Sequence, residues 1–181
     1  MLNRAIRAAM LDRNLYKQIT NEPQEMFWSI AVVLIAGSAL GLGVMNLDSN
    51  LSSGFSVTLV ILVAASTRVT VWVYWTLIIH IVGKVLLGGA GDFRTQLRNL
   101  GFVFSPGILS MFLDVPSVGP VLFSLSILWL FPAGLVAVKE TQKFDWVKTS
   151  ITSILGFTIA HAVQLFLLTQ IVSPPGWSPG G

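Results

Sequence analysis

An arginine inside a long apolar stretch is the first residue of this sequence that could do chemistry. Arg68 lies within the apolar run 55–87, where a charged side chain costs several kcal/mol unless it reaches water or pairs. Trp72 and Trp75 follow one and two turns later on the same helical face, so a cation–π contact with one of them is expected. The other apolar runs hold no acidic partner. We expect these three residues to contact outer lipid headgroups or a partner protein, with a transport role as the alternative.

Both histidines of the chain also lie in apolar runs. At 1.5 Å per residue, His80 and His161 differ in depth by roughly 10 Å, which is too far for one metal site. His161 shares a polar stripe with Thr158 and Gln164 at three-residue spacing, and such groups commonly form hydrogen bonds between helices. We therefore expect His80, His161 and Gln164 to serve helix packing. A proton or substrate path is the alternative, and metal binding is disfavoured.

Recognised catalytic arrangements do not emerge from the sequence. The run from Gly89 to Asp92 matches the GxGD string of intramembrane aspartyl proteases, but that chemistry needs two facing aspartates within the membrane. The other aspartates all fall in predicted loops: Asp12, Asp48, Asp114 and Asp145. HExxH, GxSxG and P-loop motifs are missing, as is cysteine. The sequence predicts no catalytic residue, metal or cofactor, and hence a protein that is not an enzyme.

The composition indicates an integral membrane protein. Hydrophobic residues make up 54% of the chain and charged residues only 10%, whereas soluble domains carry about 25% charged residues. The net charge of +3 could suggest nucleic acid, but the basic residues lie between apolar runs, as in membrane topology. We therefore expect no nucleic-acid partner. We also expect no cleaved leader, with the first span acting as an anchor.

The apolar runs predict an all-α, polytopic protein with five transmembrane helices. Residues 1–25 form a basic arm, either a short helix on the membrane surface or a loosely ordered segment. The membrane domain covers residues 26–172, and 173–181 are an irregular tail rich in proline and glycine. The expected spans are about 27–45, 55–87, 97–113, 121–138 and 150–172.

Three of these spans carry features beyond length. Gly37 and Gly41 are four residues apart in the first span, a spacing that lets another helix approach closely. The second span is longer than the bilayer core, so it must tilt, kink or project. Pro106 should kink the short third span and Pro132 the fourth.

The segment 83–107 predicts a basic, glycine-bent corner between two helices. Gly88, Gly89 and Gly91 suit a helix end and a tight turn, and Asp92 stands where a helix N-cap is wanted. Arg94 and Arg98 follow, four residues apart. Near a membrane surface such residues attract anionic lipid headgroups, or they only set the topology.

The distribution of basic residues predicts the orientation. The arm holds four Lys or Arg, the corner three and the loop 139–148 three, so ten of eleven fall on one side of a five-span protein. The positive-inside rule makes that side cytoplasmic, with the N-terminus inside and the C-terminus outside. A re-entrant third segment would place 139–148 outside, so we favour a kinked crossing.

Motifs at this corner also resemble a known family. They are Gly88-Gly89, Gly91, Phe93-Arg94, Leu97-Arg98, Gly101-Phe102 and Pro106, followed more weakly by Pro116, Gly119, Trp129 and Val138-Lys139. They resemble the Yip (Ypt-interacting protein) membrane-domain family, small bacterial type, over roughly residues 25–172. A frequent family run, Gly-Tyr-Ala-Gln-Ala-Pro, reads GFVFSP here. The resemblance implies five membrane helices with a cytoplasmic N-terminus, and for bacterial relatives no agreed activity.

We therefore expect a non-enzymatic scaffold or accessory subunit in the inner membrane of a bacterium. It would pack against membrane lipids, anionic at the cytoplasmic face, or against a protein partner or a second copy of itself. The alternative is a small transporter or channel subunit that uses the polar residues within its spans, since broken helices can line transport sites.

Overall fold

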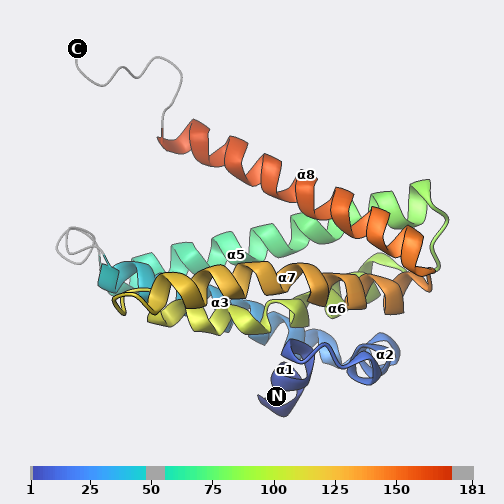
Figure 1. The fold of residues 1–181 in the computed structure, drawn as a ribbon, viewed down its shortest axis with the longest axis horizontal. Coiled ribbons are helices and arrows are strands. Elements are labelled where there is room, and N and C mark those ends of the chain that lie inside the picture. Colours follow the sequence, from blue (N-terminus) through green and yellow to red (C-terminus); the bar gives the residue numbers. More distant parts are fainter. Residues whose placement is uncertain (1, 48–55, 173–181) are drawn as a thin grey trace.

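A computed structural model describes residues 2–47 and 56–172 of the chain, without the side chains of Leu47, His161 and 163–172. Every secondary-structure element in this part is helical, which confirms the all-α prediction (Figure 1). In chain order the helices are α1 (Leu2–Ala9), α2 (Arg13–Asn21), α3 (Glu25–Leu47), α5 (Val57–His80), the π-helix η1 (Ile81–Leu86), α6 (Phe93–Val103), the 3₁₀-helix η2 (Ser105–Phe112), α7 (Gly119–Gln142) and α8 (Trp146–Val172).

Helices occupy all five ranges that were expected to span the membrane. Three of them are long and apolar enough to cross, judged on the described residues: Glu25–Asn46, Val57–Leu86 and Gly119–Gln142. α8 covers the fifth range with 27 residues. The second range is continuous over 30 residues because η1 follows α5 directly, with wider backbone turns.

The short third range is divided between two kinds of helix. α6 ends at Val103, and Pro106 lies in the first turn of η2, where its missing N–H leaves no bond unmade. The predicted break at Pro106 is therefore confirmed, as a change from α to 3₁₀ geometry. η2 packs tightly on α3, since a Cβ added to Gly43 would lie only 2.0 Å from the Ser110 carbonyl oxygen.

α3 and α5 approach each other through the predicted glycines. A Cβ at Gly37 would lie 2.6 Å from the Ala65 Cα, and one at Gly41 would lie 2.9 Å from the Ile61 Cα. Real side chains do not tolerate such distances to backbone atoms, so only glycine allows this spacing. Gly37 and Gly41 thus bring α3 and α5 into close contact within the chain itself.

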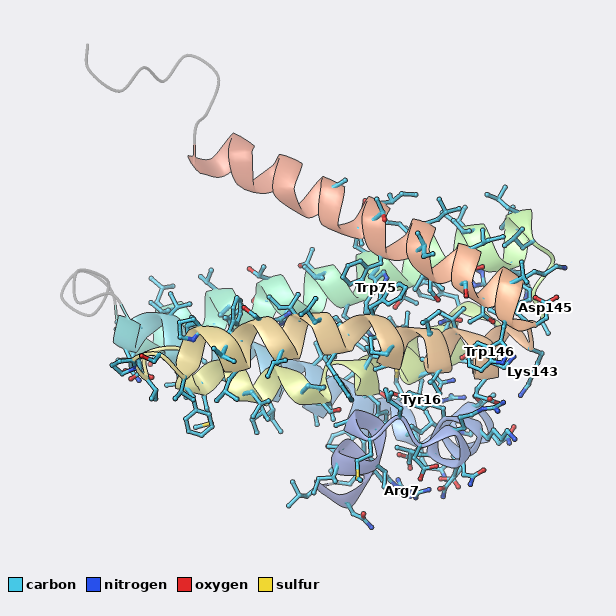
Figure 2. All side chains as sticks on the ribbon, in the orientation of Figure 1. Arg7, Tyr16, Trp75, Lys143, Asp145 and Trp146 are labelled. Carbon is cyan, nitrogen blue, oxygen red and sulfur yellow. The ribbon has the colours of Figure 1, made fainter. Side chains whose placement is uncertain are left out.

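The N-terminal arm is two short helices docked on the bundle. Asp12 caps α2, its Oδ1 accepting from the Asn14 amide at 2.9 Å. Arg7 donates to Asp12 at 2.7 Å, which holds the pKa of that carboxyl below its usual value. Leu15, Tyr16 and Ile19 of α2 are buried. Figure 2 places Tyr16 against the bundle and Arg7 on the outer side of the arm.

The connection from α7 to α8 lies at the end of the bundle nearest α2. Lys143 ends α7 in the left-handed conformation, with φ of 59°. The Lys139 ammonium lies 4.3 Å from the centre of the Trp146 ring, and Asp145 accepts from the Lys148 amide at 2.8 Å. Lys143, Asp145 and Trp146 therefore lie together where α7 turns into α8 (Figure 2).

The close contact of α3 with α5 predicts that Gly41→Leu lowers the melting temperature of the purified protein in mild detergent. Overpacking of this kind costs about 1–3 kcal/mol. Leu42→Phe is the matched control, because the neighbouring side chain is exposed. Thermal unfolding followed by circular dichroism measures both variants. Equal melting temperatures for Gly41→Leu and wild type would contradict the contact.

Candidate functional site

Arg68 lies on the face of α5 that packs against the bundle. Its Cβ would be 3.0 Å from a Cβ built on Gly37 of α3, and its guanidinium carbon is 5.6 Å from the centre of the Phe104 ring. The cation–π contact expected with a tryptophan is thus made with Phe104, between α6 and η2. The side chain is half-buried, and no described acidic residue pairs with it.

Trp72 and Trp75 are core residues, which corrects the expected contact with lipid or a partner. Only 3% of Trp72 and 4% of Trp75 are exposed. The Trp72 indole N–H donates to the Leu97 carbonyl at 2.9 Å, joining α5 to α6. The Trp75 ring meets Phe104 and Phe157 edge-on, with centroids 5.9 and 6.1 Å apart, and lies between α5 and its neighbours (Figure 2). The face shared with Arg68 is the packed one.

His80 has an aromatic neighbour. Its ring meets Phe93 edge-on at 5.7 Å, while the nearby Thr76 hydroxyl donates to the Trp72 carbonyl of its own helix. His80 therefore serves packing between the end of α5 and the start of α6. The side chains of His161 and Gln164 lie outside the described part of the structure, so their expected packing role stays a prediction.

The two arginines of the corner have separate roles. Arg94 is exposed, in keeping with a surface position. Arg98 is only 6% exposed and points at the last turn of α2: its Nε donates to the Ile19 carbonyl and its Nη2 to the Thr20 carbonyl, both at 2.7 Å. The lipid contact expected for Arg98 is therefore replaced by an internal one. A cation at a helix C-terminus also complements the helix dipole.

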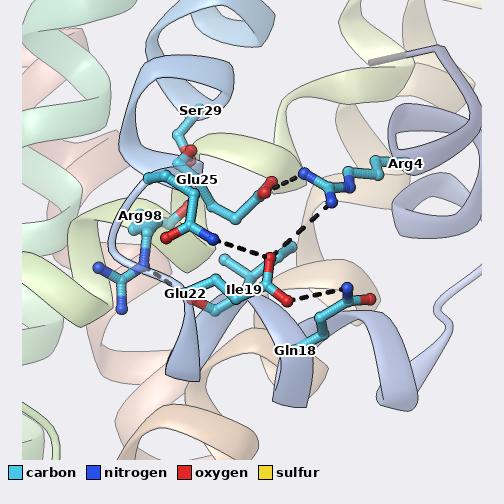
Figure 3. A network of polar contacts seen from close by, with 8 residues as sticks. Arg4, Gln18, Ile19, Glu22, Glu25, Ser29 and Arg98 are labelled. Carbon is cyan, nitrogen blue, oxygen red and sulfur yellow. Dashed lines mark hydrogen bonds and ion pairs between the residues drawn. The ribbon is translucent and has the colours of Figure 1, made fainter.

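A polar network joins α1, α2, α3 and α6 around this arginine (Figure 3). The Ser29 hydroxyl of α3 donates to the Arg98 carbonyl at 2.7 Å. Arg4 of α1 pairs with Glu25, which is 1% exposed, and lies 3.8 Å from Glu22. Gly101 lets α6 approach, because its Cβ would be 2.6 Å from that of Ser29. Sequence reasoning missed this network, although four basic residues in the arm marked its location.

The end of α7 completes the network from the other side. Glu140, 4% exposed, accepts from Arg13 Nη2 at 2.7 Å. The Asn99 amide donates to the Thr20 and Thr141 hydroxyls at 2.8 and 2.7 Å. These contacts tie α2, α6 and α7 together. The only sequence signal for them is that polar residues end an apolar run.

Gln142 of α7 holds the glycine corner. Its side-chain oxygen accepts from the Gly91 amide at 3.1 Å, and its main-chain oxygen accepts from the Ala90 amide at the same distance. Its amide nitrogen donates to Gln96 Oε1 at 3.2 Å. A Cβ at Gly89 would lie 2.2 Å from the Gln142 side-chain oxygen and 2.8 Å from the Phe144 ring, so a larger residue there would displace these side chains. Gly88 has φ of +70° and Asp92 caps α6, both as predicted.

The polar contacts of this region connect helices to one another. Buried arginine, glutamine and asparagine side chains cross-connect helix ends, and apolar and aromatic groups fill the interior. Within residues 2–47 and 56–172, no three His, Cys, Asp or Glu side chains come together as metal ligands would.

The fold and its apolar helices define an α-helical membrane protein. The chain matches the Yip1 domain over residues 12–168 and belongs to that family, which confirms the resemblance seen at the glycine corner. Comparison with curated proteins and with solved structures found no match.

Proposed function

We propose that this Yip1-domain protein is a non-enzymatic scaffold or accessory subunit of a bacterial inner membrane. The observation that carries the proposal is the unpartnered outer face of α5. In the most apolar stretch of this helix 11% of the residues are buried, against 44% in α3 and 39% in α7. A helix that gives so little of its surface to its own bundle offers the rest to lipid or to another membrane protein.

The exposed face of α5 is a continuous stripe at helical spacing. Its apolar members are Leu59, Leu62, Val63, Val73 and Leu77. Between them lie exposed hydroxyls that bond within the helix: Thr67 donates to the Val63 carbonyl and Thr70 to the Ser66 carbonyl, each at 2.9 Å. The stripe thus needs no polar partner. Small hydroxyl residues at this level suit a second helix, because helix interfaces in membranes favour small side chains.

One observation favours the rival function, a transporter or channel subunit. Arg68 is directed into the bundle and has no acidic partner among the described residues. An unpaired cation in a membrane-spanning helix is a functional-site hypothesis by default. Exposed Arg94 would serve either function by attracting anionic lipid headgroups at the cytoplasmic face.

Scaffolding through α5 predicts that Leu62→Trp weakens assembly. A bulky ring on a packed helix face blocks close approach, whereas fluid lipid accommodates it. Leu128→Trp on α7 is the matched control, since that side chain is similarly exposed. Co-purification in mild detergent and native mass spectrometry measure the assembly. We expect loss of a protein partner or of a homo-oligomer in Leu62→Trp alone.

Two results together would replace the scaffold with the rival function. The first is an assembly state that Leu62→Trp leaves unchanged. The second is a saturable flux in liposomes that is lost in a well-inserted Arg68→Leu variant. Unchanged assembly without any flux would still contradict docking through α5.

We also propose five crossings, with the N-terminus in the cytoplasm and the C-terminus outside, supported by the charge count. The chain has no cysteine, so single thiols report their side directly. Ala90→Cys in the exposed glycine corner should label only after permeabilisation, and Ser117→Cys in the exposed turn before α7 should label from outside intact cells. Labelling of both cysteines from the same side would contradict a single membrane crossing between residues 90 and 117.

A further inference from the structure

An apolar groove of about 650 Å³ runs between α1, α3, η2 and α7. Its walls include Val32 and Ala36 of α3, Pro106 and Leu109 of η2, and Leu125 of α7. α1 closes one side with Leu2, Ala5 and Ile6. No charged side chain lines the groove among the described residues. Its volume lies within the range of about 300–1,000 Å³ that is typical of small-molecule sites.

The groove opens onto the surface that α3 and α7 present to lipid. Its rim residues Ile35, Ile108, Leu125 and Trp129 are between 42% and 52% exposed. α3 and α7 are both among the helices long and apolar enough to cross the membrane. The groove is therefore continuous with the surface that α3 and α7 present to lipid, and it lies beside the hydrocarbon of the bilayer.

α1 is fixed across the groove by polar contacts. The Trp129 indole N–H donates to the Ala9 carbonyl at the end of α1, at 2.6 Å. Arg4 pairs with Glu25 and Arg7 with Asp12, so the charges of α1 are neutralised on the side away from the groove. Its apolar side chains are left for the groove. Beside α1, Figure 1 shows α3, η2 and α7 running alongside one another.

We propose that this groove holds one acyl chain of a bilayer phospholipid, retained beneath α1. The lining is apolar, the neighbouring medium is hydrocarbon, and a flexible chain can follow an irregular surface. An α-helix is about 10–12 Å across with its side chains, so a space of this volume would hold fewer than about two turns of a partner helix. The groove shares no residue with the exposed face of α5, and the site does not depend on the proposed scaffold function.

Photolabelling of the full-length protein tests this site. The protein is placed in phosphatidylcholine nanodiscs that contain a trace of phosphatidylcholine with a diazirine at the end of one acyl chain. Adducts are mapped by mass spectrometry on the groove residues Ile108, Leu109 and Leu125, and on the exposed residues Ile151 and Ile154 of α8 as bulk-lipid controls, which lie outside both the groove and the exposed face of α5. We expect more labelling per residue in the groove than on α8, because a retained chain stays longer than an exchanging one.

Filling the groove gives the decisive comparison. Ser105 lines the groove and its hydroxyl has no hydrogen-bond partner in the described structure, so Ser105→Leu removes no bond while it adds apolar volume. Ala5→Phe fills the same space from α1. Both variants should lose groove adducts and keep those on α8. Native mass spectrometry should show a retained phospholipid on the wild type that both variants lose.

Three results would overturn the proposal. Labelling that is equal in the groove and on α8 would mean that the groove exchanges freely with bulk lipid. Groove adducts that persist in both filled variants would place the chain elsewhere. A co-purifying protein that protects the groove from labelling would make the occupant a partner. Circular dichroism melting of each variant confirms that the compared proteins are folded.

Discussion

A buried guanidinium group needs oxygen atoms that accept its hydrogen bonds, and Arg98 has two such acceptors at the end of α2. Placing a charge away from water is costly unless hydrogen bonds replace its hydration, and bonds to charged groups contribute about 1.5–3 kcal/mol each. Here Nε and Nη2 donate to the Ile19 and Thr20 carbonyls in the last turn of α2, and the Ile19 carbonyl also accepts from the Glu22 amide at 3.4 Å. One side chain thus bonds two helix-end acceptors and satisfies its own charge. The docking of the N-terminal arm on the membrane domain depends on this exchange.

The need of buried polar groups for hydrogen-bond partners also explains the rest of the polar network. Ser29 meets the Arg98 carbonyl from α3, Asn99 bridges α2 and α7, and Gln142 bonds the glycine corner. Gln142 pairs a backbone amide that lies outside the helices, whereas Ser29 and Asn99 cross-connect neighbouring helices. The glycines of the corner matter for a related reason, because a Cβ at Gly89 would clash with the Gln142 side chain and one at Gly91 would clash with Thr141. Basic residues of the arm and of the corner therefore hold the helices together.

Local signals in the sequence predicted the helices well and their rotations poorly. The helix ranges, the Asp92 cap, the positive φ of Gly88 and the break at Pro106 follow from neighbouring residues. The orientation of α5 does not, because this helix is apolar on every side and its periodicity marks no inner face. For that reason Trp72 and Trp75 were expected at lipid, although they lie in the core. Arg98 was expected at headgroups, because pairing with carbonyls 78 and 79 residues away leaves no trace in spacing.

Arg98 fastens α2 to the membrane domain, and hydrogen–deuterium exchange of the α2 amides tests this role most directly. Lysine keeps the charge but cannot reach both carbonyls with one planar group. Residues 13–21 should be protected in the wild type and should exchange faster in Arg98→Lys. The matched variant Arg94→Lys, at an exposed position one turn away, should exchange as the wild type does. Unchanged protection of α2 in Arg98→Lys, or fast exchange already in the wild type, would contradict this role.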